Sequence, residues 1–409
     1  MDCALSHNRA ADTTSASGGA VYVHDGSLRL RGCELRNNTV SALESRGGAV
    51  FAGGMGEVST DNCTLEGNRA LGVAGDDSTG GEGGSAYLTD DVTGRFNSTV
   101  FSDSRAGGGG ALVATGRSRS LVAQCELANN TAQSNTAAAG RAAGAGGALL
   151  VMGNASLQCT HTTFVANHAR TVVQPGGRVY VLATGGAVAV RGAEEDEAAA
   201  AAAAESVVFV SSRFINNTAV RGGALAVERM ATPVQLEGCV LHGNVAAVQR
   251  QASSASSGLG GAMFAQRANV TVNDTDWNLN RAESQGGAVY LDGGTLRAHG
   301  STFVGNSATR QGGAAYMRSP TMAESQSGVR LELHGCSFFG NRGVAGRQDD
   351  AAVVYTMGAA VLAEQASLAG GGSARGSIQL HQHDAPGTAV ECSLAEDLAS
   401  MDGLAINLG

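Results

Sequence analysis

The segment from Gly18 to Asn38 reads GGAVYVHDGSLRLRGCELRNN, and it holds both of the short motifs that recur along the chain. The first motif is Gly-Gly-Ala followed by three apolar or aromatic residues. The second is an apolar anchor residue three positions before an Asn, as in Leu35 and Asn38. Strict alternation of two motifs over a whole chain indicates a repeat architecture, in which each repeat is one structural unit.

The Gly-Gly-Ala motif begins at Gly18, Gly47, Gly146, Gly185, Gly222, Gly260, Gly286 and Gly312, with weaker copies at Gly83, Gly109 and Gly358. The anchor motif ends at Asn8, Asn38, Asn68, Asn130, Asn167, Asn217, Asn244, Asn280, Asn306 and Asn341. The first Gly and the following Asn are about 20 residues apart in most repeats, whereas the distance from that Asn to the next Gly pair varies widely. A constant segment followed by a variable one predicts a fixed coil with loop insertions at one corner.

Apolar and polar residues alternate within the constant segment, which is typical of β-strands. From Leu28 to Arg36 every second side chain is predicted to face inward, with one change of phase at Gly32 that marks a corner. Three short strands per coil are expected: one after the Gly pair, one before this corner and one ending at the Asn. The sequence therefore predicts an all-β fold, a right-handed three-sided parallel β-helix (solenoid) of about eleven coils.

The domain organisation follows from where the repeats lie. Residues 1–363 are predicted to be β-helix repeats, and residues 364–409 a degenerate last coil or a carboxy-terminal extension. Residues 193–206 form a low-complexity, acidic and Ala-rich insertion, and a second insertion covers Ser319 to Gly328. The chain opens within a repeat and without the features of a signal peptide, which favours a truncated start.

Composition excludes several classes of protein. The 409 residues include 60 Gly but only 4 Pro, without a three-residue period, which excludes collagen. The 43% of apolar residues and the net charge of −9 argue against disorder and give no electrostatic footprint for nucleic acid. No apolar run is long enough for a transmembrane helix.

The ten Asn residues of the anchor motif are predicted to form a structural ladder. Asn tolerates a left-handed backbone at a corner, and its amide can hydrogen-bond to the Asn of the next coil. Such a ladder satisfies backbone groups of the turn that are otherwise buried without partners.

Six of the eight cysteines lie two residues before the anchor and are predicted to form an inward column. There they can act as small apolar side chains, or neighbouring pairs such as Cys3 and Cys33 can form a disulfide. Cys392 joins them if Leu394 is an anchor, and Cys159 is off register. The column comprises Cys3, Cys33, Cys63, Cys125, Cys239 and Cys336.

Aromatic residues recur as the third residue after the Gly pair. If this column faces outward it forms a candidate binding stripe for sugars or proteins, and if it faces inward it is core. The outward orientation is predicted because the neighbouring positions are always apolar. The stripe comprises Tyr22, Phe51, Tyr87, Phe264, Tyr290 and Tyr316.

Eight Asn-x-Ser/Thr sequons are candidate N-glycosylation sites in a secreted protein, although an Asn- and Thr-rich turn also generates sequons by chance. They are Asn37, Asn62, Asn97, Asn129, Asn154, Asn216, Asn269 and Asn273.

Histidines and acidic residues are the candidates for metal binding or catalysis. His299 and His334 share a repeat position and are expected to stack outward, and His381 and His383 resemble half of a metal site, although surface histidines are commoner. The acidic pairs are expected to be solvated loop charges without a basic partner in fixed register. These pairs are Asp76-Asp77, Asp90-Asp91 and Asp349-Asp350. We therefore expect no catalytic residue, no cofactor and no metal.

The two motifs resemble the repeat of the chlamydial polymorphic outer-membrane proteins, in which GGA followed by apolar residues alternates with Phe-x-x-Asn. Similar repeats occur in other bacterial surface proteins and in extracellular β-helix proteins of protists and algae. The resemblance covers nearly the whole chain and implies a right-handed, pectin lyase-like β-helix exposed at the cell surface and often adhesive. The Ala run at 198–204 is closer to an algal or protist member.

We therefore expect a non-catalytic cell-surface or secreted scaffold that acts in adhesion or in contact with the wall or with carbohydrate. The alternative is a polysaccharide lyase or hydrolase on a pectate-lyase-like β-helix, because a fold does not decide function. A fragment of a larger protein is a third interpretation. Expected partners are carbohydrate or other surface proteins, not nucleic acid. The expected location is extracellular, or outer-membrane associated if the source is bacterial.

Overall fold

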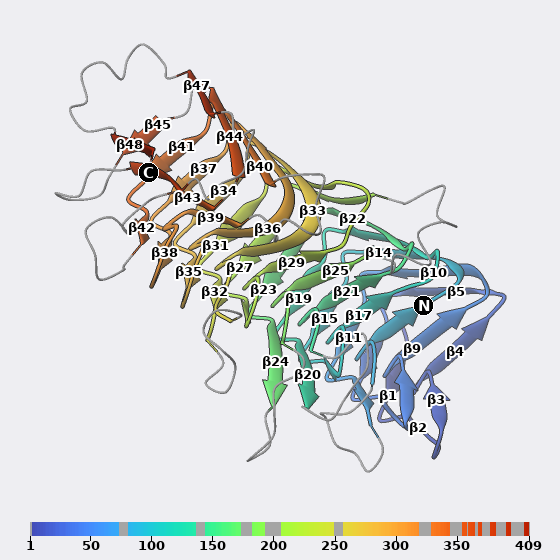
Figure 1. Cartoon of the computed structure of the whole chain (residues 1–409). Coiled ribbons are helices and arrows are strands. Elements are labelled where there is room, and N and C mark those ends of the chain that lie inside the picture. Colours follow the sequence, from blue (N-terminus) through green and yellow to red (C-terminus); the bar gives the residue numbers. More distant parts are fainter. Residues whose placement is uncertain are drawn as a thin grey trace.

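The computed structural model describes residues 2–72, 81–135, 144–172, 182–192, 206–248, 257–318 and 329–343, and the backbone of six short strands between 354 and 408. Within these ranges the structure is all-β, and every strand pairing is parallel. Figure 1 shows strands of successive repeats lying side by side from the N-terminus to the C-terminus. This arrangement is consistent with a parallel β-helix.

The anchor strands form a 12-stranded sheet in which each strand pairs with its equivalents in the neighbouring repeats. Leu35 pairs with Leu5 and Leu65, so equivalent anchors lie over one another. The strands are β1(Ala4–Ser6), β6(Glu34–Arg36), β11(Thr64–Glu66), β15(Val100–Ser102), β19(Glu126–Ala128), β23(Thr163–Val165), β27(Arg213–Ile215), β31(Val240–His242), β34(Asp276–Asn278), β37(Thr302–Val304), β41(Ser337–Phe339) and β45(Ser367–Ala369).

The strands after the Gly pair and the strands before the next corner belong to one 23-stranded sheet. The first series is β4(Val21–His24), β9(Val50–Gly53), β13(Ala86–Leu88), β17(Leu112–Ala114), β21(Leu149–Met152), β25(Val188–Arg191), β29(Leu225–Glu228), β39(Ala315–Arg318), β43(Val354–Met357), β46(Ser377–His381) and β48(Ala405–Leu408). The second is β5(Ser27–Arg31), β10(Met55–Asp61), β14(Asp91–Asn97), β18(Arg119–Ala123), β22(Ser156–Thr160), β26(Val207–Val210), β30(Val234–Glu237), β40(Val329–His334), β44(Ala359–Glu364) and β47(Val390–Ser393). In β33(Met263–Asn273) and β36(Val289–His299) the two series are one continuous strand.

A short strand directly after the ladder Asn was not predicted. These strands form an 11-stranded sheet, and β3(Ser15–Ser17) pairs with β8(Glu44–Arg46) beside it. The prediction of three strands per repeat was therefore wrong in detail: the first two share a sheet, and the third large sheet comes from the segment after the Asn. Its strands are β2(Arg9–Ala11), β7(Thr39–Ser41), β12(Arg69–Leu71), β16(Arg105–Ala106), β20(Thr131–Asn135), β24(His168–Val172), β28(Thr218–Ala219), β32(Val245–Ala246), β35(Arg281–Ala282), β38(Ser307–Ala308) and β42(Arg342–Gly343).

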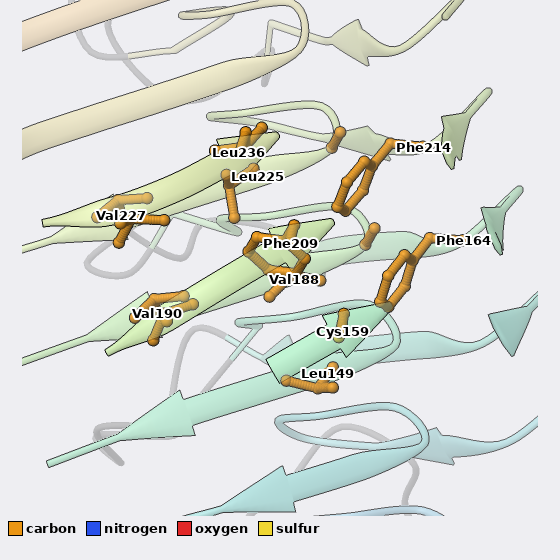
Figure 2. Close-up of a cluster of buried hydrophobic side chains, with 14 of the residues drawn as sticks. Leu149, Cys159, Phe164, Val188, Val190, Phe209, Phe214, Leu225, Val227 and Leu236 are labelled. Atoms are coloured by element: carbon orange, nitrogen blue, oxygen red, sulfur yellow. The ribbon is translucent and has the colours of Figure 1, made fainter. Parts of the chain in front are cut away.

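The main hydrophobic core lies between the sheets and consists of like side chains stacked on like. Phe214 stacks on Phe164 with ring centroids 4.9 Å apart, and Val190 pairs with Val227 in the neighbouring strand. Figure 2 shows these side chains projecting from successive strands toward the same interior. Burial of each column removes apolar surface from water and contributes about 25 cal/mol of stability per Å² buried. A single repeat could not bury this surface alone.

The Gly pair is required by the backbone at the turn into each strand. Gly47 has φ +65°, which side chains rarely adopt, and a Cβ on Gly48 would collide with the carbonyl oxygen of Gly84 in the next repeat. The first Gly therefore makes the turn, and the second allows the backbones of neighbouring repeats to approach.

Candidate functional site

The ladder asparagines are joined by hydrogen bonds from repeat to repeat. The backbone N–H and Nδ2 of Asn167 both donate to Oδ1 of Asn217, at 2.9 and 3.0 Å. Nδ2 of Asn217 also donates to the carbonyl oxygen of the anchor Phe164, at 3.0 Å. The same pattern connects Asn130 through Asn341 and, separately, Asn8 through Asn68; Ser104 replaces Asn between the two runs.

The left-handed residue at this corner is the one before the ladder Asn, not the ladder Asn itself. Asn37 has φ 54° and Asn216 has φ 54°, while the ladder residues Asn38 and Asn217 are absent from the positive-φ positions. The predicted backbone role therefore belongs to the preceding residue. The ladder Asn is completely buried there, and its side chain serves as a hydrogen-bonding group.

The column predicted to contain cysteines is a second hydrogen-bonded ladder. Two residues before every buried anchor from Leu35 to Phe338 stands a Cys, Ser or Thr. The backbone N–H of Thr99 donates to Sγ of Cys125 at 3.4 Å, and that of Cys239 donates to Oγ1 of Thr275 at 3.3 Å. The position thus requires a small group that both donates and accepts, rather than a small apolar side chain.

The seven described cysteines are free thiols, and Cys392 lies among residues whose side chains are outside the described part. All but Cys3 are buried, and burial raises the pKa of the Cys125 and Cys239 thiols to about 11. A neutral buried thiol is a poor nucleophile and metal ligand. Cys159, off register in sequence, lies in the main core beside Phe209.

The prediction that the aromatic stripe faces solvent is wrong. Tyr22 is 58% exposed, but the other five aromatic residues are only 1–7% exposed. Their side chains do point away from the main core, and they pack with apolar neighbours into two separate clusters. Neighbouring rings stack, with centroids 5.1 Å apart for Tyr290 and Tyr316. A binding platform at this column is therefore excluded for every member except Tyr22.

The chain segment before each Gly pair explains this burial. Because the first Gly turns the chain sharply, the preceding segment lies over the outer side of the strand that follows. The guanidinium of Arg46 is 5.7 Å from the ring centroid of Tyr87. The guanidinium of Arg221 is 5.2 Å from the ring centroid of Phe264. Sequence alternation alone gives no sign of this cover.

The sequons lie at corners and on the outer sheet surface. Five are exposed, at Asn37, Asn62, Asn97, Asn129 and Asn216, and Asn154, Asn269 and Asn273 are half-buried. At Asn37, Asn129 and Asn216 the motif combines a corner Asn, the ladder Asn and a Thr that begins the next strand. The fold accounts for these three sequences by itself, and glycosylation stays a prediction.

His299 and His334 stack with ring centroids 4.6 Å apart, as predicted. His381 is described only by its backbone, and His383 lies outside the described residues. In the described ranges no group of three or more His, Cys, Asp or Glu side chains could hold a metal ion. Nor do those ranges contain a helix that could cross a membrane.

Of the acidic pairs, Asp76-Asp77 and Asp349-Asp350 lie outside the described residues. Asp91 does have a basic partner, contrary to the prediction: Nε and Nη2 of Arg117 donate to its two carboxylate oxygens at 2.8 and 2.6 Å. These bonds lower the pKa of the Asp91 carboxyl. The pair joins neighbouring repeats, but both side chains are exposed, and such a pair contributes little to stability.

The structure also reveals a row of polar side chains that sequence reasoning missed. Five neighbouring strands of the 23-stranded sheet carry polar side chains that pair with one another in register: Arg191, Glu228, Gln266, Asp292 and Arg318. We call these five residues the polar row. Each lies six positions after the first Gly of its motif, so alignment of the motifs would have identified it.

Along the polar row, each charged side chain pairs with an oppositely charged side chain of a neighbouring strand. Nε of Arg191 is 3.1 Å from Oε2 of Glu228, and Nη2 of Arg191 donates to Thr184. Asp292 accepts from Nε2 of Gln266 at 3.0 Å and from Nε and Nη2 of Arg318 at 3.2 Å each. The row is therefore an ion-paired surface whose planar groups are held in place by one another.

The polar row is only partly accessible. The side chain of Asp292 is 9% exposed, those of Glu228 and Arg191 are 19% and 20% exposed, and that of Arg318 is 47% exposed. Near the row, burial lowers the pKa of Arg221, while the carboxylates of Glu228 and Asp292 oppose that shift.

No family model matches the chain, and no curated protein is detectably similar to it.

Proposed function

We propose that the chain is a right-handed, three-sided parallel β-helix of about eleven coils that serves as a non-catalytic scaffold at the cell surface or outside the cell. Pairing of like strands in three parallel sheets supports the helix, and parallel crossover connections are almost always right-handed. The resemblance of its motifs to the polymorphic outer-membrane protein repeat supports the location.

One observation carries the scaffold role: the residues that recur in every repeat are occupied by internal structure. In the described repeats after the first, the ladder Asn, the Cys/Ser/Thr position, the anchors and most of the aromatic column are buried. Sequence length varies instead between the ladder Asn and the next Gly pair. A scaffold that holds its shape with the constant residues and presents variable loops at one corner fits this division.

The test is the location of the protein in its source cells. Antibodies raised against the purified chain should label intact cells, or the culture medium should contain the protein. Labelling only after permeabilisation, with nothing in the medium, would overturn the proposal. As a matched test of catalysis, incubation with pectin, alginate and neutral polysaccharides should release no reducing ends or unsaturated products.

A polysaccharide-active enzyme is the second candidate, and the polar row is the observation that favours it. Glu228 and Asp292 lie two strands apart, about 9.6 Å at the usual strand spacing, which is near the separation of paired carboxylates in inverting glycosidases. Asp292, however, is neutralised by the guanidinium of Arg318 and also accepts from Gln266. Both carboxylate oxygens of Asp292 are thus occupied by donors from the protein, so the row supports binding better than hydrolysis.

A further inference from the structure

The polar row is distinguished from the other outward positions by where the insertions lie. Only two insertions interrupt the otherwise constant part of the repeat, and they follow directly after the two ends of the row. Residues 193–205 come after the strand that ends at Arg191, and residues 319–328 come after the strand that ends at Arg318. Insertions in repeat proteins concentrate on the face that binds.

The chemistry of the row suits hydroxyl groups. Carboxylates, amides and guanidinium groups are planar, and each offers two parallel donors or acceptors to a pair of neighbouring hydroxyls. In the described part of the chain no hydrogen bond joins Glu228 to Gln266, although they are adjacent in register and Gln266 donates to Asp292. Carboxylate and amide oxygens each have two lone pairs, so Glu228, which pairs with Arg191, and Gln266, which donates to Asp292, can still accept from a ligand donor.

Charge and spacing narrow the class of ligand. Two guanidinium groups and two carboxylates leave the row with no net charge, which does not favour an acidic polymer. The five side chains follow one another at the strand spacing of about 4.8 Å, so the row extends over roughly 19 Å in one line. A linear ligand that repeats its hydroxyl groups can contact several of them at once.

We propose that the polar row binds a neutral linear polysaccharide, which runs along the direction in which the repeats stack. This assignment rests on the proposed function, because it names the contact through which a surface scaffold meets the wall or a neighbouring cell. Glu228 and Gln266 accept from sugar hydroxyls, and Arg318, the most exposed member, donates to them at one end of the row.

The experiment uses the full chain and a panel of neutral xylan, mannan, galactan and cellulose oligosaccharides, with pectin and alginate as acidic polymers. Affinity electrophoresis or calorimetry should detect binding to at least one neutral polymer. Glu228→Gln and Gln266→Ala should each weaken it tenfold or more without a change in thermal midpoint. Glu332→Gln is the matched control, since Glu332 pairs with Arg297 at 2.7 Å on another row of the same sheet, and it should bind like the wild type.

Hydrogen exchange of the unmutated chain gives a second measurement that does not depend on variants. Bound polymer should slow exchange around the polar-row residues of β25, β29, β33, β36 and β39 and leave β41 unchanged. Failure of every neutral polymer to bind, equal binding by the row variants and the control, or binding of the acidic polymers alone would overturn the assignment. Each of these results leaves the surface scaffold intact, because cell labelling tests that role separately.

Discussion

Replacing Asn217 by Ala tests the Asn ladder where it is most deeply buried. The substitution removes the four hydrogen bonds of the Asn217 side chain. Nδ2 of Asn167 and Oδ1 of Asn244 keep other partners, but the carbonyl oxygen of Phe164 and the backbone N–H of Asn167 lose the bonds that the Asn217 side chain makes with them. The carbonyl group of Phe164 and the N–H of Asn167 both lie in fully buried surroundings. A buried polar group without a partner costs about 1–3 kcal/mol, so two give a loss of about 2–6 kcal/mol.

Asn8 provides a matched control because it is the same residue type at the exposed end of the same ladder. Asn8→Ala loses one side-chain bond to Oδ1 of Asn38, which still accepts from the backbone N–H of residue 8. No buried group is left without a partner, and the expected loss in the free energy of unfolding is below about 0.5 kcal/mol.

Guanidinium unfolding followed by circular dichroism measures both losses. Hydrogen exchange of β23 and β27 locates them, because repeat proteins need not unfold in one step. A free energy of unfolding for Asn217→Ala within 0.5 kcal/mol of that for Asn8→Ala, taken as roughly the error of such comparisons, would refute the ladder as a source of stability.

Three further predictions concern the thiols and the aromatic column. Cys239→Ser should cost below about 1 kcal/mol and less than Cys239→Ala, because Ser keeps a group that donates and accepts; thermal midpoints in the opposite order would contradict the ladder. The pKa of the Cys125 thiol is about 11 in the folded state, against a reference value of 9.0, so folding favours the neutral thiol. This contribution to the free energy of unfolding is complete below about pH 9 and is lost as pH rises toward 11. Cys125→Ser should flatten this decline in denaturant midpoints, and an unchanged slope would disprove the assignment. Tyr290→Ala should cost about 3–5 kcal/mol and Tyr22→Ala below about 1 kcal/mol, because only the former ring is buried; equal losses by thermal unfolding would argue against the covered column.

Much of the architecture could be predicted because it depends on short-range patterns. The period-two alternation around Leu28 and Leu30 and the phase change at Gly32 appear in the structure as two strands separated by two residues, the first of which, Gly32, has φ +61°. A repeated motif also fixes which residues lie over one another, so the Asn and anchor columns could be named from the sequence.

What could not be predicted depends on how the chain folds back over itself. Tyr290 occupies an outward position in the alternation that follows the Gly pair. It is buried only because the chain segment before the Gly pair covers it. The strand after the ladder Asn was missed because it is only two to five residues long and alternates too little to be recognised. The polar row was missed because its members differ in chemistry, so no shared residue type marks the position.

Electron paramagnetic resonance distances between spin labels test most directly whether equivalent residues of consecutive repeats lie in one line. Glu34, Glu126 and Asp276 are exposed and occupy the same place in the anchor strands. Glu126 lies three repeats after Glu34, and Asp276 lies four repeats after Glu126. At about 4.8 Å per repeat, pairwise labels should give separations of about 14, 19 and 34 Å between labelled backbones, the longest equal to the other two together. Distances that do not add, or that follow sequence separation instead of repeat number, would contradict the stacked architecture.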